Sequence, residues 1–353
     1  MEKKYKLTEE YINVNSRTFY RIEALKDFAD VKKGDKGGYI ENENNLSQYN
    51  DCWIYDNAKV YGDAKIYDNA IVHGYAEVYD DTVICNNAEA YGHAEVCGNA
   101  KVYGHAEVCG NAKVYGHAEV YDYAEIYGHA EVYGYAEICD NAKVYDNAEV
   151  YDYAEVYDNA KIYDNAVVYG YSEVYDDAVI CNNAEVYGYA EVYDYAEIYG
   201  HAIICGNAKV YGHAEVYGYA VVYENAKVYG DTEVYGYAEV YDNVEVCGNA
   251  EVYENAEVYD NAKVCGYAKV YGDAKVCGNA EVCANTDYIV FKNWWSSGRY
   301  FTWTRSNNMW RVGCFYGTGK ELIEKAYKDS ELSGIEYKRV VDYVESILKT
   351  NKQ

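Results

Sequence analysis

The chain has 353 residues, no proline, 49 tyrosines and a formal net charge of −28. A surface this acidic repels phosphate backbones and anionic lipids, so nucleic acids and membranes are excluded as favoured partners. The first residues, MEKKYKLTEEYINV, contain no apolar segment of a secretory signal, and no run of about 18 apolar residues follows. We therefore expect a cytoplasmic chain whose twelve cysteines are thiols rather than a disulfide framework.

Three regions follow one another along the chain. Residues 1–39 are non-repetitive, residues 40–286 repeat with a period of six, and residues 287–353 are non-repetitive again. The first region predicts an N-terminal cap, because a solenoid exposes unpaired strand edges at its ends. The last region predicts a C-terminal α+β domain that caps the solenoid or recognises a partner.

The segment that leads into the repeats, residues 21–58, has a distinctive sequence: RIEALKDFADVKKGDKGGYIENENNLSQYNDCWIYDNA. It resembles the start of YdcK-like hexapeptide-repeat proteins, and the matching residues are Asp27-Phe28, Asp30-Val31-Lys32, Gly34, Gly37-Gly38, Asn45-Leu46-Ser47 and Asp51-Cys52-Trp53-Ile54-Tyr55. The resemblance implies a left-handed β-helix. It implies no catalytic residue here, because the transferase label of such proteins is itself inferred from their fold.

The repeat unit is Ala, then Glu or Lys, Val, Tyr or Cys, Gly or Asp, and finally Asn, His, Tyr or Asp. From Ala58 to Ala280 every sixth residue is Ala at 34 of 38 positions. Ala and Val alternate with a charged residue, which predicts a short strand with one buried face. The residues that follow tolerate positive φ and predict a turn. One strand and turn cannot bury its face alone, so the units must stack into a solenoid.

Two coil sizes fit this period. An aliphatic residue followed four residues later by a small one, as at Val60 and Ala64, is typical of a left-handed parallel β-helix with three units in an 18-residue triangular coil. The alternative is a flat two-sheet solenoid with 12-residue coils, favoured by six histidines that share one class modulo 12: His93, His105, His117, His129, His201 and His213. The spacing of 18 between Cys247, Cys265 and Cys283 favours the triangular coil. We predict an all-β solenoid of this triangular form.

Tyrosine occupies two positions of the repeat. At the fourth position, 28 of 39 units carry Tyr, ten carry Cys and one carries His. In stacked coils these side chains form ladders about 4.8 Å apart, which we interpret as structural. An aromatic stripe for a sugar, a partner or self-association is the alternative. Ten further tyrosines occupy the turn and should face solvent, and our candidates for a binding surface among them are Tyr123, Tyr135, Tyr153, Tyr189 and Tyr195.

No other part of the repeats predicts chemistry. The turn histidines alternate with Asn and Asp, which indicates turn formation rather than catalysis or metal binding. We therefore predict no catalytic residue, no metal ligand and no cofactor. The Glu and Lys column predicts an exposed face, on which Lys101, Lys113, Lys143 and Lys161 relieve repulsion between neighbouring glutamates.

The tail predicts strands over residues 288–293, 299–305 and 309–316, followed by helices over residues 318–328 and 335–349. Through the sequence from Gly313 to Thr318 it resembles C-terminal domains of phage and prophage repeat proteins. The tail residues that we expect to line a binding pocket are Trp294, Trp295, Arg299, Trp303, Arg305 and Trp310. The alternative is that they pack the domain onto the last coil.

These observations favour a non-catalytic, phage- or prophage-associated β-solenoid that acts as a rigid structural or binding scaffold for a protein or a glycan. One alternative is a hexapeptide-repeat acyltransferase, which would be a trimer with one essential histidine. Another is a structural rod that assembles through its tyrosine ladders, for example as a lateral homodimer.

Overall fold

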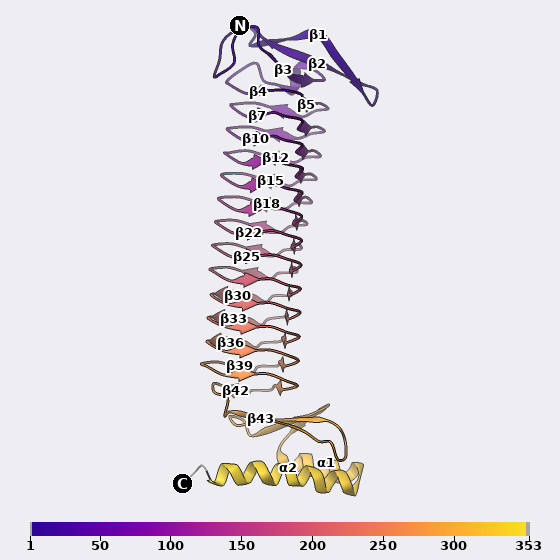
Figure 1. Cartoon of the computed structure of the whole chain (residues 1–353), viewed down its shortest axis with the longest axis vertical. Helices are drawn as coiled ribbons and strands as arrows, with labels where there is room; N and C mark the ends of the chain where they lie inside the picture. The colour runs from indigo at the N-terminus through magenta and orange to yellow at the C-terminus, as the bar shows by residue number, and fades with distance from the viewer. Residues whose placement is uncertain (1, 351–353) are drawn as a thin grey trace. The chain divides into compact units, whose positions relative to one another are not determined.

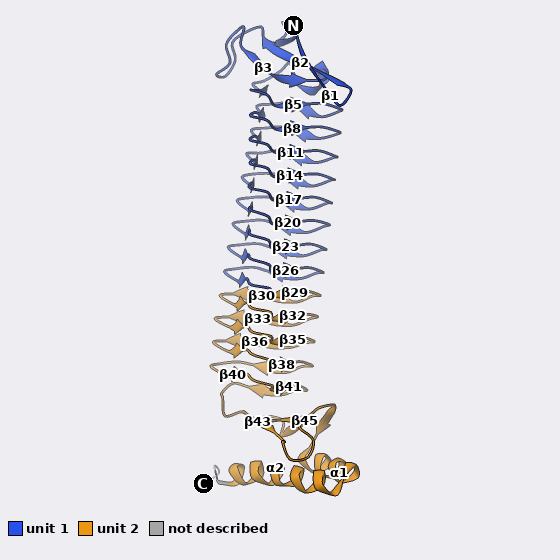
Figure 2. Ribbon diagram, turned by 45° about the vertical axis from the view of Figure 1, so that its right-hand side comes forward, with its two compact units in different colours: residues 1–201 blue, residues 202–353 orange. Residues whose placement is uncertain are grey.

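The structure is a computed structural model that describes residues 2–350, so residue 1 and residues 351–353 of the predicted end regions lie outside the described residues. The chain forms two compact units, residues 1–201 and residues 202–353, which Figure 2 draws in blue and orange. Each unit contains a parallel β-solenoid, and the second also contains a small domain of strands and helices. The predicted fold class is confirmed.

An antiparallel sheet precedes the first coil of unit 1 (Figure 1). In it, β1 (Tyr5–Val14) pairs with β2 (Arg17–Ala24), and β2 pairs with β3 (Lys36–Ile40). A short 3-10 turn, η1 (Glu43–Asn45), follows. β3 also pairs in parallel with β5 (Lys59–Val60), the first strand of one solenoid stack. The open edge of that stack is therefore covered, which protects it from pairing with another chain.

A buried lysine anchors the start of unit 1. The ammonium group of Lys4 donates hydrogen bonds to the backbone carbonyls of Tyr49 (3.2 Å), Asn50 (3.3 Å) and Cys52 (2.8 Å). These carbonyls belong to the irregular segment before the first coil, so the lysine supplies donors that a strand ladder would otherwise provide. Burial lowers the pKa of the Lys4 ammonium group.

The coils of unit 1 follow one rule. From β4 (Trp53–Ile54) to β28 (Glu197–Ile198), a two-residue strand begins at every sixth residue. Each strand pairs in parallel with the third strand after it, so Lys59 of β5 lies opposite Glu77 of β8 (Glu77–Val78). One coil therefore has 18 residues and three strands. This register confirms the triangular coil and rules out the 12-residue alternative.

The alternation of the repeat decides which side chains form the core. Ala58 and Val60 are fully buried, and so are their equivalents along unit 1, while the residue between them projects outward. Where Thr82 replaces Ala, its buried hydroxyl donates a hydrogen bond of 2.7 Å to the carbonyl of Tyr79. The polar exception is thus satisfied inside the coil.

Each corner of the coil requires a left-handed backbone, which explains the Gly or Asp at the fifth position. Gly134 has φ +74° and Asp152 has φ +62°. Glycine adopts this conformation without a steric cost, and aspartate tolerates it because its carboxylate bonds nearby backbone. The Asp80 carboxylate, for example, accepts a hydrogen bond of 3.3 Å from the backbone N–H of Gly98 in the next coil.

Unit 2 repeats the pattern from β29 (Ile203–Ile204) to β42 (Glu281–Val282), again with a strand every sixth residue and partners 18 residues apart. Most of these strands have two residues. The exceptions, with four residues each, are β30 (Lys209–Gly212), β33 (Lys227–Gly230) and β36 (Glu245–Gly248).

The C-terminal domain of unit 2 is an antiparallel sheet with two helices packed on it (Figure 1). Its elements are β43 (Tyr288–Lys292), β44 (Tyr300–Thr304), β45 (Met309–Val312), β46 (Phe315–Gly317), α1 (Gly319–Asp329) and α2 (Glu331–Thr350). The third predicted strand is divided into β45 and β46, because Gly313 has φ +57° and turns the chain. The second helix begins four residues earlier than predicted, where the Ser330 hydroxyl accepts a hydrogen bond from the N–H of Ser333 (3.0 Å).

Backbone and side-chain hydrogen bonds join this domain to the last coils of unit 2. The Thr302 hydroxyl accepts from the N–H of Lys275 (2.9 Å), and the Ser306 hydroxyl accepts from the N–H of Glu281 (2.6 Å). The hydroxyl of Tyr288 donates to a carbonyl of the same coils, that of Lys269 (2.8 Å). The domain therefore satisfies backbone groups that the end of a parallel stack leaves open.

Candidate functional site

Five exposed aromatic side chains form a continuous stack at one corner of unit 1. This corner ladder consists of His117, Tyr135, Tyr153, Tyr171 and Tyr189. Successive ring centroids are 4.7, 4.9, 4.8 and 5.1 Å apart, and neighbouring rings are parallel to within 6°. The four tyrosines remain 47–60% exposed. Three of the predicted binding residues, Tyr135, Tyr153 and Tyr189, are therefore brought together, and Tyr171 completes the row.

Local backbone geometry positions the corner ladder. Each of its rings follows a residue with positive φ, for example Gly134 before Tyr135 and Asp152 before Tyr153. The next residue is a buried alanine in four cases and the buried Ser172 after Tyr171, so the ring must point away from the core. The 18-residue coil then places equivalent rings one above another, at the spacing of neighbouring strands.

A second tyrosine ladder lies two residues before the corner ladder in each coil, directly after the two-residue strands. It consists of Tyr115, Tyr133, Tyr151, Tyr169 and Tyr187, whose rings stack at 4.8–4.9 Å. Its hydroxyls reach carboxylates of the next coil: Tyr115 donates to Glu131 (3.1 Å) and Tyr133 to Glu149 (3.2 Å). This pattern supports the structural interpretation of the fourth-position tyrosines.

A column of glutamates lies two residues after the corner ladder. This glutamate column consists of Glu119, Glu137, Glu155, Glu173 and Glu191, which lie opposite one another in consecutive parallel strands. At one end Lys101 pairs with Glu119 at 2.5 Å. The three central members have a glutamate on either side. In other columns Lys113 pairs with Glu131 (3.0 Å) and Lys143 pairs with Glu125 (2.8 Å), as predicted. The prediction is wrong for Lys161, whose neighbours in the adjacent strands are Lys143 and Val179. Shorter runs of glutamate occur in another column, at Glu89, Glu107 and Glu125 and at Glu215, Glu233 and Glu251.

Glu155 is at the centre of the glutamate column. The Glu137 and Glu173 carboxylates accept hydrogen bonds from Tyr121 (3.4 Å) and Tyr157 (3.2 Å). The position that would supply such a donor to Glu155 holds Cys139. Partial burial, followed by the repulsion of Glu173 and Glu137, raises the pKa of the Glu155 carboxyl group. The column therefore stores like-charge repulsion that a cation would relieve.

The other predicted tyrosines of the solenoid lie elsewhere. Tyr123 is 60% exposed and stacks on His105 with ring centroids 4.9 Å apart, at a different corner of unit 1. Tyr195 follows Tyr123 by 72 residues, which is four coils of 18, so it shares that corner without being next to Tyr123. Neither belongs to the corner ladder.

The predicted tryptophan and arginine residues of the tail separate into buried and exposed groups. Trp303 and Trp310 are each 2% exposed and pack in the core of the C-terminal domain, with Phe301 and both helices. Trp294 and Trp295, in the loop after β43, are 71% and 79% exposed. They do not converge with the buried pair. Trp303 and Trp310 do have a packing role, but inside the C-terminal domain, whereas the alternative had placed them against the last coil.

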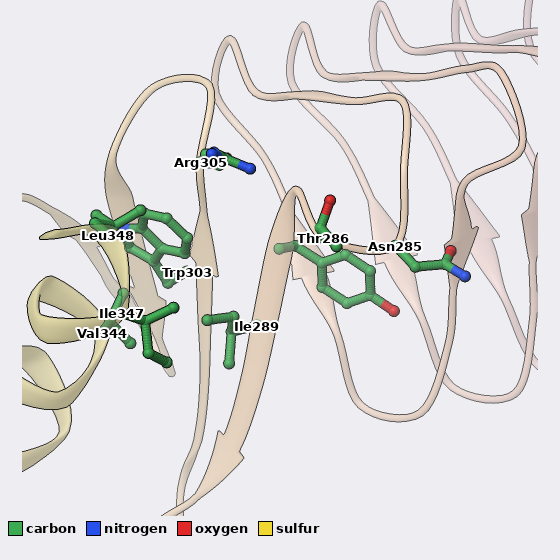
Figure 3. Close-up of a pocket in the computed structure, with 9 residues that line it drawn as sticks. Asn285, Thr286, Ile289, Trp303, Arg305, Val344, Ile347 and Leu348 are labelled. Atoms are coloured by element: carbon green, nitrogen blue, oxygen red, sulfur yellow. The ribbon is translucent and has the colours of Figure 1, made fainter. Parts of the chain in front are cut away.

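Arg305 and one edge of Trp303 do share a pocket, which Figure 3 shows. It has a volume of about 420 Å³ and lies between β43, α2 and the segment after the last coil. Ile289, Ile347 and Leu348 supply its apolar wall. Arg299 does not line it, and its side chain lies 3.5 Å from the position that a Cβ would occupy at Gly313. Of the six predicted tail residues, two therefore line this pocket.

A shallow depression near the start of unit 1 surrounds the one histidine at the fourth repeat position. His73 stacks on Tyr91 at 4.8 Å, and its Nε2 atom is 3.9 Å from the Glu89 carboxylate. Asp30 lies across the depression, where it accepts a hydrogen bond of 2.5 Å from the Tyr55 hydroxyl. The sequence did not lead us to expect a site at these residues, although His73 is the only departure from Tyr and Cys at the fourth repeat position.

The prediction that every cysteine is a thiol is wrong for one pair. Cys265 and Cys283 form a disulfide across adjacent strands of unit 2, with Cα atoms 4.4 Å apart. The physical reason is the coil length, since residues 18 apart lie side by side in a parallel stack. Among the described residues, these two sulfurs and the Glu281 carboxylate also form the one group of potential metal ligands that lie within 4.8 Å of one another.

No protein-family model matches the chain, and no curated protein sequence matches it. Within residues 2–350, neither helix is long and apolar enough to cross a membrane.

Proposed function

We propose that this chain is a non-catalytic scaffold that binds an elongated, positively charged protein segment along one corner of unit 1. The observation that supports the proposal is that the exposed corner ladder and the glutamate column run side by side through the same coils. Repeat proteins commonly use such extended surfaces for binding.

The geometry of the corner ladder favours a peptide over a glycan that stacks on ring faces. Apart from the outer faces of the two end rings, each ring face in the ladder is covered by the next ring at 4.7–5.1 Å. What remains exposed are ring edges and phenol oxygens. The aliphatic stems of Lys and Arg pack against such apolar edges while their charged heads reach further. The carboxylates two residues away are within the range of those heads.

The negative charge of the chain also favours a positively charged partner. The chain carries a net charge of −28, which attracts cations from a distance. Two carboxylates about 4.8 Å apart repel each other by about 0.9 kcal/mol in water. A bound ammonium or guanidinium group replaces this repulsion by attraction, and guanidinium also forms paired hydrogen bonds with carboxylates. Binding should therefore weaken steeply with added salt.

A fluorescein-labelled polyarginine peptide is the probe that tests the proposal, with the full chain titrated in and fluorescence anisotropy measured. The Tyr153→Ala/Tyr171→Ala double variant removes the centre of the corner ladder. The triple variant Glu137→Gln/Glu155→Gln/Glu173→Gln removes the central charges. We expect each to weaken binding by about tenfold or more, as loss of central contacts typically does.

The matched control is the triple variant Glu215→Gln/Glu233→Gln/Glu251→Gln on a different column of unit 2. It removes the same charge but leaves the corner ladder intact. We expect it to retain nearly all binding. If the two triple variants weaken binding equally, net charge alone attracts the peptide and the proposed surface is wrong. Unchanged binding of the tyrosine double variant would also contradict it.

The glutamate column opposes lateral self-assembly through the tyrosine ladders. A second copy brought face to face at this corner would place glutamates against glutamates, which is unfavourable. We therefore expect a monomer in light scattering at low salt. The proposed phage or prophage association is supported by the resemblance of the tail sequence, and a survey of neighbouring genes tests it.

The depression around His73 supports a second candidate function, acyl transfer. A histidine oriented by a carboxylate can remove a proton from an acceptor hydroxyl or amine, and His73 lies 3.9 Å from Glu89. Acyl-coenzyme A turnover by the purified chain, abolished by His73→Asn, would establish it. Absence of turnover across acyl donors and acceptors would leave the scaffold function.

A further inference from the structure

Three consecutive rungs of one ladder in unit 2 carry cysteine: Cys247, Cys265 and Cys283. Elsewhere among the described ladders, a cysteine has no cysteine on the next rung and stacks against other residues, mostly tyrosines. A cysteine next to a tyrosine can raise the pKa of that tyrosine, as Cys109 does for Tyr91 after the larger effect of burial. The run therefore differs from the use of cysteine as a small substitute for tyrosine in the other ladders.

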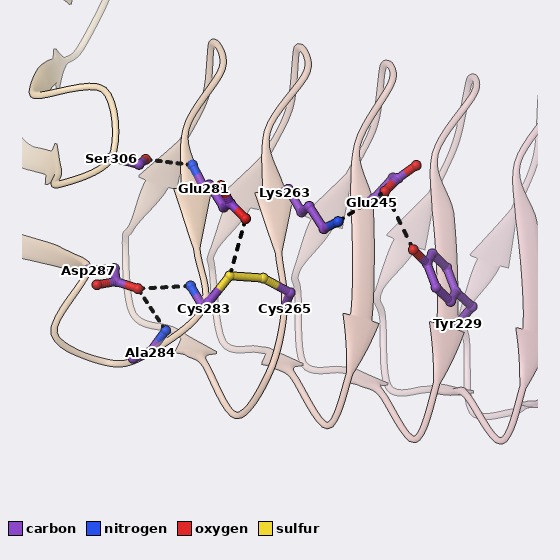
Figure 4. Close-up of a disulfide and its surroundings, with 9 residues drawn as sticks. All are labelled: Tyr229, Glu245, Lys263, Cys265, Glu281, Cys283, Ala284, Asp287 and Ser306. Carbon is purple, nitrogen blue, oxygen red and sulfur yellow. Dashed lines mark hydrogen bonds and ion pairs between the residues drawn. A yellow bond between two sulfur atoms is a disulfide. The ribbon is translucent and has the colours of Figure 1, made fainter.

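We propose that Cys265, Cys283 and Glu281 form a redox-controlled site for a thiophilic divalent cation of the Zn²⁺ class. Their ligand atoms lie within 4.8 Å of one another, and the Cys283 sulfur is 3.6 Å from a Glu281 carboxylate oxygen (Figure 4). Two thiolates and one carboxylate are a ligand set suited to Zn²⁺. Three protein ligands leave a fourth tetrahedral position for water or another ligand.

The surroundings of the site favour access and balance its charge. A depression of about 280 Å³ is lined by Glu281, Cys283, Asp287, Arg305 and Ser306, so the site is reached from solvent. Asp287 is already engaged, because its carboxylate accepts hydrogen bonds from the N–H groups of Cys283 (3.0 Å) and Ala284 (2.9 Å). It fixes the backbone that carries one thiol. Arg305 offsets the negative charge that two thiolates and two carboxylates bring together.

The disulfide is the closed state of this site. In the reduced state both cysteines are thiols, and metal binding displaces their two protons so that both sulfurs bind as thiolates. Once the metal has left, a small-molecule disulfide such as oxidised glutathione can accept the two electrons. The first cysteine loses its proton and attacks as a thiolate, which forms a mixed disulfide and releases one small thiolate that takes up the proton. The second cysteine reacts with the mixed disulfide in the same way and releases the other small thiol. The products are the Cys265–Cys283 disulfide and two small thiols, so electrons and protons balance.

Cadmium binding to the full chain tests the proposal, because cadmium–thiolate bonds absorb in the ultraviolet. After reduction and removal of the reductant, we expect the chain to bind one tight equivalent of Cd²⁺ that Zn²⁺ displaces. Cys265→Ser and Cys283→Ser should each lose this equivalent. Glu281→Gln should weaken it by about tenfold or more, since even outer ligand partners contribute that much. The control Cys109→Ser alters a cysteine whose ladder neighbours are tyrosines and should retain it.

Oxidised glutathione provides the second arm of the experiment. We expect it to abolish Cd²⁺ binding, to form a disulfide that peptide mass spectrometry maps to Cys265 and Cys283, and to be reversed by reductant. Tight binding that survives in Cys265→Ser and Cys283→Ser would overturn the proposal, because the ligands would then lie elsewhere. Formation of the mapped disulfide without any metal binding by the reduced chain would overturn it as well, and would identify a purely structural bond.

Discussion

Replacement of Glu155 by lysine should stabilise unit 1 and weaken binding of a cationic partner at the same time. In the structure Glu155 lies opposite Glu137 in one neighbouring strand and Glu173 in the other. Lysine at this position would remove two repulsive contacts and create two attractive ones. Lys143 shows that the geometry permits this, because it pairs with Glu125 of the adjacent coil at 2.8 Å.

The expected magnitude follows from the exposure of these side chains. Solvent and salt reduce each contact to roughly 0.3–0.5 kcal/mol, so four altered contacts give a gain of about 1–2 kcal/mol for Glu155→Lys. The isosteric variant Glu155→Gln only removes repulsion and should gain about half as much, roughly 0.5–1 kcal/mol. Urea unfolding followed by circular dichroism measures both gains as shifts of the midpoint to higher urea.

Salt and pH distinguish this explanation from a change in packing. The pKa of the Glu155 carboxyl group is raised, so the folded chain binds this proton more tightly than the unfolded chain. The free energy of unfolding of the wild type therefore falls as the pH rises from the unfolded pKa through the raised folded value. The gain of Glu155→Gln should be full above that window and absent below it, and about 1 M salt should reduce it. A gain that is independent of salt and pH, or a loss of stability, would show that repulsion between these glutamates does not destabilise unit 1.

Three further predictions concern the repeats. Gly134→Ala should lower the free energy of unfolding by about 1–2 kcal/mol because its backbone is left-handed, with φ +74°. It should lose more through a clash, since the new Cβ would lie 2.7 Å from a backbone nitrogen of the next coil. The control Gly298→Ala, with φ +66° and no atom within 4 Å of the new Cβ, should show only the loss caused by the left-handed backbone when both are measured by urea unfolding. Tyr133→Phe should cost about 0.5–1.5 kcal/mol through loss of the hydrogen bond to Glu149, and an unchanged urea midpoint would contradict it. Burial raises the pKa of ladder tyrosines, that of Tyr145 to about 12, whereas unfolded tyrosine ionises near pH 10, about the usual value. Stability should therefore be complete below this pH and fall above it, with tyrosinate absorbance appearing together with loss of circular dichroism.

The sequence was sufficient to predict the solenoid, because one local rule repeats without interruption. Alternation of Ala58 and Val60 with a charged residue defines the strand and its buried face, and the following Gly or Asp defines the corner. The six-residue repeat alone does not determine the coil length, which had to be predicted from another feature of the sequence. Cysteines spaced by 18 residues supplied it, whereas the histidine pattern modulo 12 pointed to the wrong alternative.

The candidate surface was predictable only in part. Tyr135, Tyr153, Tyr171 and Tyr189 differ by 18 residues, so a count of columns modulo 18 would have found the corner ladder. The run of five glutamates was visible in the same way. Without the coil length, neither column could be recognised, and Tyr123 and Tyr195 were grouped with the others only because they are turn tyrosines.

The packing of the C-terminal domain could be predicted from the sequence only in part. Phe301 and Trp303 alternate along β44, as Trp310 and Val312 do along β45, and this alternation predicts one buried face. It did not show that helices α1 and α2 would cover that face. The disulfide was not predictable from spacing alone, because Cys247 and Cys265 have the same separation of 18 as Cys265 and Cys283.

Hydrogen–deuterium exchange of the full chain, with and without the polyarginine peptide, locates the surface that the peptide covers. We predict added protection in unit 1, confined to the coils that carry the corner ladder and the glutamate column, residues 117–191. Peptides from the coils of unit 2, including those with Glu233 and Glu251, should show no change. Protection spread evenly over both units, or concentrated in unit 2, would contradict the claim that this corner is the binding surface.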